Sequence, residues 1–103
     1  MKNMAEMQRM MKAAKEMQDR LQKEMEETRV EGTAGGGVVA VTLDGRKSLI
    51  ALRIDKDVVN KDDVEMLQDL IMAAFHDASA KVDETLGSKL GALGAGLKIP
   101  GLF

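Results

Sequence analysis

The first fifteen residues concentrate side chains that can bind phosphate. Four basic residues stand there against a single acid, although the whole chain carries a formal net charge of −2. Lysine and arginine neutralise nucleic-acid phosphates without reading base sequence. The segment therefore predicts a polyanion-binding surface, while the alternative is a solvated helix face, the usual reason for a run of charges. The residues concerned are Lys2, Arg9, Lys12 and Lys15, with Glu6 as the one acid.

The charge distribution and the aromatic content narrow the choice of polyanion. Arg20 and Lys23 continue the basic face of the first segment, Lys89 and Lys98 make the C-terminal end basic, and acids concentrate in the middle of the chain. There is no Trp or Tyr, and only two Phe. Proteins that bind single strands stack bases on aromatic side chains, whereas phosphate contacts need none. The composition thus favours duplex DNA over a single strand.

Other patterns that could support chemistry lack the necessary partners. His76 is the only histidine and has no second ligand one turn away. The glycines at 35–37 precede an expected strand, whereas a phosphate-binding loop precedes a helix. The acids between 55 and 69 lack the glycine and the terminal glutamate of a calcium loop. Because cysteine is also absent, the sequence predicts no catalytic site, metal, cofactor or small-molecule substrate.

The basic residues are expected to lie on a long projecting helix over 1–28. Apolar side chains recur there at intervals of three and four residues, which is the spacing of a helix with one apolar stripe. Such a stripe packs within a dimer or binds a partner protein, and its coiled-coil spacing favours the dimer. The stripe contains Met4, Met7, Met11, Ala14, Met17, Leu21 and Met25.

Residues 29–55 are expected to form a three-stranded antiparallel meander. The strands are predicted over 29–33, 38–43 and 48–54, with the glycine cluster before the second strand and a hairpin turn at Asp44-Gly45. Side chains alternate in the second and third strands, so six of them should line one apolar surface. These are Val39, Val41, Leu43, Ile50, Leu52 and Ile54.

A second helix is expected over 60–86, with Asn60 as its N-cap. Repeated glycines should interrupt it and leave a glycine-rich tail over 87–103. No apolar run reaches the length of a membrane-spanning helix. The sequence therefore predicts a single α+β domain over 1–103, in a soluble cytoplasmic protein with no membrane partner.

Four segments together resemble the YbaB/EbfC family of bacterial nucleoid-associated proteins. They are the Met-, Gln- and Lys-rich opening over 7–18, the glycine segment over 30–38, the helix "DDVEMLQDLIMAAFHDA" over 62–78, and the closing "LKIPGLF" over 97–103. The resemblance implies a tweezer-like homodimer formed through the sheets, from which the long helices project. It also implies DNA binding in the bacterial cytoplasm and nucleoid, a role in nucleoid organisation or gene expression, and no enzymatic activity.

These lines converge on a homodimeric duplex-DNA binder that contacts the phosphate backbone. The alternative is a protein–protein interaction module that uses the Met-rich helices as a clamp. The predicted DNA-binding residues are Lys2, Arg9, Lys12, Lys15, Arg20, Lys23, Lys89 and Lys98. The predicted dimer-interface residues are Val38, Val39, Val41, Leu43, Ile50 and Leu52.

Overall fold

Two helices and a three-stranded sheet make up the fold. The structure, a computed structural model, describes residues 2–94. The chain runs through α1 (Lys2–Glu27), β1 (Val30–Ala34), β2 (Val39–Leu43), β3 (Leu49–Ile54), the short 3₁₀ helix η1 (Lys56–Val58) and α2 (Val64–Gly94). The strands are antiparallel in the order β1-β2-β3. The predicted α+β fold is confirmed, and the dimer remains a prediction.

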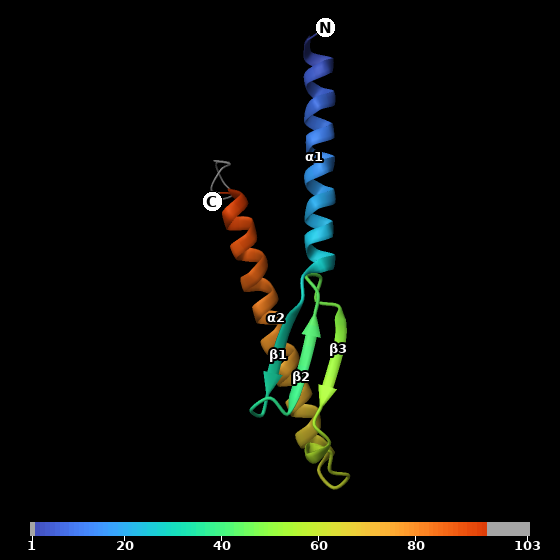
Figure 1. The fold of residues 1–103 in the computed structure, drawn as a ribbon, viewed down its shortest axis with the longest axis vertical. Helices are drawn as coiled ribbons and strands as arrows, with labels where there is room; N and C mark the ends of the chain where they lie inside the picture. Colours follow the sequence, from blue (N-terminus) through green and yellow to red (C-terminus); the bar gives the residue numbers. More distant parts are fainter. Residues whose placement is uncertain (1, 95–103) are drawn as a thin grey trace.

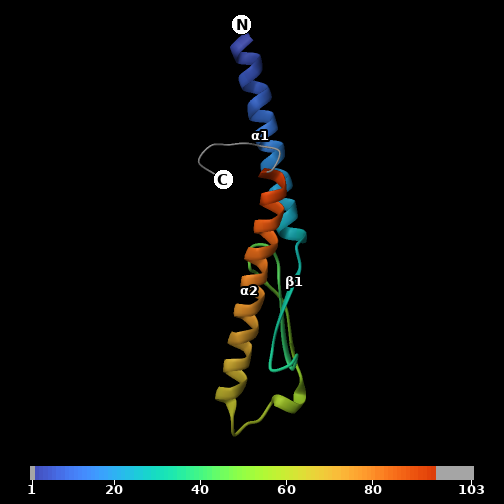
Figure 2. The same cartoon turned by 90° about the vertical axis from the view of Figure 1, so that its left-hand side faces the viewer.

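The molecule is long and narrow, with extents of 74 × 22 × 16 Å. α2 covers one face of the sheet (Figures 1 and 2). α2 begins near one end of the sheet, and α1 extends away from the other end. The start of α1 and the start of α2 therefore lie at opposite ends of the protomer.

The core lies between β2 and α2. Alternate side chains of β2 point to the helix, as the two-residue period of a strand requires. Each Val or Leu that is fully buried contributes roughly 1.5–3 kcal/mol, so this small interface supplies much of the stability of the protomer. The completely buried residues are Val39, Val41 and Leu43 from β2, with Ala74, Ala78 and Val82 from α2.

β1 approaches α2 closely because Gly32 faces the helix. A Cβ atom at this position would overlap the backbone of Ala74 and Ala78. Glycine and alanine thus allow the strand backbone to lie directly on the helix backbone. The sequence prediction placed residue 32 in the first strand but did not find this close contact.

The two hairpin loops use glycine in different ways. Gly35, Gly36 and Gly37 have positive φ angles of 62°, 76° and 98° and form the β1–β2 loop. In the β2–β3 loop the positive φ, 64°, belongs to Lys47 rather than to Gly45. The predicted hairpin turn at Asp44-Gly45 lies at the start of this loop, which closes through the Ser48 carbonyl, the acceptor for the Asp44 N–H at 3.1 Å.

The bounds of the second helix also differ from the prediction. The Asp63 carboxylate accepts from the Met66 N–H at 3.2 Å and caps α2, while Asn60 accepts from the Asp62 N–H at 2.9 Å in the preceding turn. α2 then continues to Gly94, through two glycines that were expected to interrupt it. Each interior glycine costs only about 1 kcal/mol relative to alanine, so the helical residues around it can sustain the helix. Residues 95–103 of the predicted tail lie outside the described part of the chain.

A carboxylate on α2 ties the edge strand β1 to the helix. Asp77 accepts from the Thr33 N–H at 3.0 Å and pairs with Lys81 at 3.1 Å. The backbone hydrogen bond from Thr33, followed by the hydrogen bond from Lys81, lowers the pKa of Asp77. Lys81 also donates to the Glu31 carbonyl at 3.2 Å. Together these groups hold the outer strand against the helix.

The lowered pKa of Asp77 predicts a pH-dependent contribution to stability. Because the folded-state pKa lies below the unfolded value, the contribution is present above about pH 4 and is lost as pH falls through the folded-state pKa. Asp77→Asn should therefore be less stable than the wild type at about pH 7, and the gap should be smaller at about pH 3. Urea unfolding followed by circular dichroism measures both gaps. An equal gap at the two pH values would contradict this role for the charge.

Candidate nucleic-acid interface

α1 projects from the sheet with its side chains open to solvent. Every residue from Asn3 to Arg20 is exposed, and the first partly covered side chain is Leu21, near the base of the helix. The helix forms because its residues are almost all strong helix formers, including Met, Ala, Lys, Glu and Gln. The first two-thirds of α1 thus present a free helical rod (Figure 1).

Five of the predicted DNA-binding residues lie on α1. Their side chains are all exposed, and the ion pairs found between the described residues involve none of them. The five are Arg9, Lys12, Lys15, Arg20 and Lys23. The side chain of Lys2 and the whole of Lys98 lie outside the described part.

The five cations do not form one continuous face. By the helical period of about 100° per residue, Arg9, Lys12, Arg20 and Lys23 share one side of α1, while Lys15 lies nearer the Met stripe. The acids Glu16 and Asp19 occur among the cations of the basal half. Positive charge is therefore least compensated towards the tip of α1.

Lys89 has a structural role in this protomer that the sequence did not indicate. Its ammonium group donates to the Glu24 carboxylate at 2.8 Å and to the Thr28 hydroxyl at 3.3 Å. Lys89 thus joins α2 to the base of α1, where Thr28 is buried. The contact joins residues 65 positions apart, which explains why local sequence patterns could not predict it.

Gly45 supports the base of α1 from the β2–β3 loop. Its N–H donates to the Met25 carbonyl at 2.8 Å, and a Cβ at this position would lie 2.7 Å from the Met25 Cα. Arg46 adds an ion pair to Glu26 at 3.6 Å. The sequence analysis explained Gly45 by the geometry of the hairpin turn. The structure shows instead that residue 45 must be glycine because its backbone lies against the backbone of α1. These contacts set the direction in which the basic rod leaves the sheet.

The Met stripe is exposed on the protomer. Met7 and Met11 retain 61% and 70% of their accessible surface, and Met4 and Met10 are similarly open. Within the described chain, the stripe is therefore not part of the protomer core. Its side chains are available to a second subunit or another partner.

The predicted dimer-interface set divides into two groups. Val39, Val41 and Leu43 are buried under α2 in the protomer. Because side chains covered by a helix of their own chain have no surface left for a partner, their assignment to a subunit interface is corrected. Val38 is partly buried against the same core. Ile50 and Leu52 on β3 are 47% and 43% exposed and remain available.

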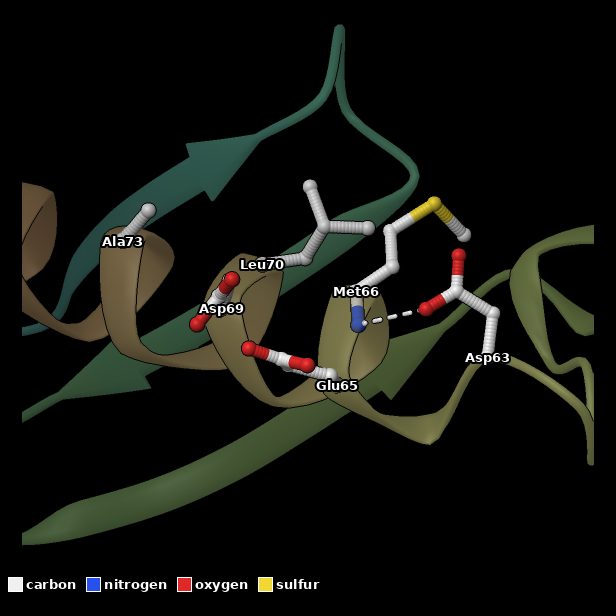
Figure 3. A pocket seen from close by; sticks show the side chains of 6 residues that line it. All are labelled: Asp63, Glu65, Met66, Asp69, Leu70 and Ala73. Atoms are coloured by element: carbon white, nitrogen blue, oxygen red, sulfur yellow. Dashed lines mark hydrogen bonds between the residues drawn. The ribbon is translucent and has the colours of Figure 1, made fainter.

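Among other kinds of site in residues 2–94, one shallow groove stands out. His, Asp and Glu side chains in this range form no group of three that could hold a metal ion. None of its helices combines the length and apolar character of a membrane span. A shallow groove of about 470 Å³ lies beside the start of α2 and is lined by Asp63, Glu65, Met66, Asp69, Leu70 and Ala73 (Figure 3).

Comparison with known proteins identifies the family. Residues 1–97 match the YbaB/EbfC DNA-binding family. The chain is 46% identical to a nucleoid-associated protein of Bartonella tribocorum over 103 residues, covering 97% of this chain and 96% of that protein. It is 44% identical to a nucleoid-associated protein of Dictyoglomus thermophilum over the full length of both chains.

The fold matches a solved structure as well. The crystal structure of an uncharacterised protein from Helicobacter pylori superposes with a TM-score of 0.70 at 24% identity, covering 84% of this chain and 91% of that chain. This likeness supports the arrangement of two helices and a three-stranded sheet. The family match over residues 1–97, together with relatives at 44–46% identity, leads to one conclusion: the chain belongs to the YbaB/EbfC DNA-binding family.

Proposed function

We propose that this protein binds duplex DNA as a homodimer, through phosphate contacts made by the first helices. The observation that carries the proposal is the placement of Arg9, Lys12 and Lys15 on the exposed tip half of α1, which extends away from the sheet. Family membership supplies DNA as the polyanion. Its relatives are named nucleoid-associated proteins. We extend this to a proposed cytoplasmic, nucleoid-associated role in nucleoid organisation or gene expression.

The position of the acids supports the assignment of the tip. The acidic segment over 55–69 lies near the start of α2, at the opposite end of the protomer from the basic tip (Figure 1). Screening at physiological salt limits charge interactions to about 8 Å, so acids at the far end of a 74 Å molecule do not oppose phosphate binding at the tip. A net charge of −2 is therefore compatible with DNA binding.

The exposed side of β3 is the surface that best suits the proposed homodimer. Leu49, Ile50 and Leu52 lie on this edge strand and are each more than 40% exposed. A second copy would remove this apolar surface from water and protect the open edge of the sheet. Two protomers joined in this way would carry two basic rods, which together provide more phosphate contacts than one.

The proposed binding mode predicts a steep and linear dependence on salt. For a protein that neutralises Z phosphates, log affinity falls against log salt with a slope of about −0.9Z. Three contacts from each subunit would give a slope of about −5. Fluorescence anisotropy of a labelled duplex with purified protein across a salt series measures it. Absence of binding at low salt would overturn the DNA proposal.

A second candidate is a clamp for another protein. It is favoured by the exposure of Met7 and Met11 on the protomer, because flexible methionine surfaces suit adaptable partner binding. Binding of DNA with no measurable salt slope, or no DNA binding at all, would favour this candidate over the phosphate clasp.

A further inference from the structure

The groove beside the start of α2 combines an apolar floor with an acidic rim. Met66, Leu70 and Ala73 supply the floor, while Glu65 and Asp69 lie one turn apart along the outer side (Figure 3). Met66 is 40% exposed, and Glu65, Asp69 and Ala73 are also open to solvent. The protomer thus leaves apolar surface uncovered next to two free carboxylates.

The tip of α1 carries the complementary pattern. Met7 and Met11 form an apolar row, and Lys12 and Lys15 lie on the adjoining side, also about one turn apart. The nine residues from Met7 to Lys15 span about 12 Å of helix, the same as the roughly 12 Å of α2 between Glu65 and Ala73 along the groove. Apolar side chains would meet the floor, and the two ammonium groups would meet the rim.

The tip cannot reach the groove of its own protomer. The two features lie at opposite ends of a molecule 74 Å long (Figure 1). Contacts from Glu24 to Lys89 and from Gly45 to Met25 hold the base of α1 in place. The occupant that fits both the charge and the apolar surface is therefore another copy of the chain.

We propose that the groove receives the tip of α1 from a second molecule, so that proteins associate end to end. Residues of α2 that contact β1 place the groove on the β1 flank: Asp77 accepts from Thr33, and Leu70 approaches Gly35. The exposed apolar residues of β3 lie on the opposite edge of the sheet. A dimer formed through β3 would leave the groove open, and each added molecule would present a new tip and a new groove.

DNA and the groove compete for the same lysines. This consequence rests on the proposed DNA binding, whereas the dimer used as the reference species below rests on the proposed homodimer. Lys12 and Lys15 belong both to the proposed phosphate-binding surface and to the docking surface. Duplex DNA should therefore dissociate end-to-end assemblies into DNA-bound dimers. The association itself is tested without DNA, so its failure is distinguishable from failure of DNA binding.

The test is sedimentation velocity of the full chain, without DNA, over a range of protein concentrations. At about 20 mM salt the wild type should form species larger than the dimer, and these should disappear at about 300 mM salt as the charges are screened. Lys12→Glu/Lys15→Glu and Glu65→Lys/Asp69→Lys should each associate at least about ten-fold more weakly, because each places like charges together.

A mixture of the two charge-reversed proteins gives the decisive result. The glutamates at the tip of the Lys12→Glu/Lys15→Glu protein then face the lysines in the groove of the Glu65→Lys/Asp69→Lys protein. The wild-type tip of the second protein also matches the wild-type groove of the first. The mixture should therefore recover the larger species. Glu27→Lys/Glu84→Lys changes the net charge by the same amount as Glu65→Lys/Asp69→Lys, but at positions outside both surfaces. This control variant should associate as the wild type does. Failure of the mixture to associate, or wild-type association by Glu65→Lys/Asp69→Lys, would overturn the proposal.

Discussion

Gly32→Ala is expected to lower the free energy of unfolding by about 3 kcal/mol or more, because overpacking against fixed backbone is costly. The new Cβ would overlap the backbone at Ala74 and Ala78, and neither group is a flexible side chain that can move aside. β1 would have to lift from α2, which would loosen the Asp77–Thr33 hydrogen bond and expose the edge of the core. For a small domain with a total stability of about 5–15 kcal/mol, this is a large fraction.

Gly87→Ala is the matched control for this prediction. Gly87 lies inside α2, it is exposed, and a Cβ there meets no atom within 4 Å. The same substitution should therefore stabilise the protein by up to about 1 kcal/mol through helix propensity. Urea unfolding followed by circular dichroism at 222 nm, at equal protomer concentration, compares the variants. Equal stability of Gly32→Ala and the wild type would contradict the close packing of β1 on α2.

Replacement of Arg9, Lys12 and Lys15 by alanine is expected to lower DNA affinity at low salt by about a hundredfold or more. In a dimer the triple variant removes six cations, so the salt slope should flatten by about 5. Because phosphate contacts carry no base information, the loss should be similar for every duplex sequence. Alanine is the best helix former, so α1 should keep its helical content.

A second triple variant separates the position of the charges from their number. Arg53→Ala/Lys56→Ala/Lys61→Ala removes the same charge from β3 and from the η1 region, at the end of the protomer away from the α1 tip. Anisotropy titrations of both variants against the same duplex should show a large loss only for the α1 variant. Equal losses would mean that net charge decides affinity, and unchanged affinity of the α1 variant would remove α1 as the DNA-binding surface.

The sequence by itself determined the elements and the family. The three- and four-residue spacing of Met4, Met7 and Met11 specified a helix, and the alternation in 39–43 specified a strand, because both periods follow from backbone geometry. The glycine segment and the "DDVE" helix indicated the family that the comparison confirms. The separation of Arg9, Lys12, Arg20 and Lys23 from the apolar stripe of α1 also followed from the local pattern, because the helical period places these cations on another side of the helix.

Only the tertiary structure decided which surfaces remain free and which glycines must be glycines. Strand alternation places Val41 on an apolar face but does not say whether a helix of the same chain or another subunit covers it, and α2 covers it. Lys89 looks like any exposed cation until folding places it 2.8 Å from Glu24. Gly32 and Gly45 are required by backbone from α2 and α1, respectively. These properties depend on contacts between residues far apart in sequence, so they exist only once the helices pack and no local pattern encodes them.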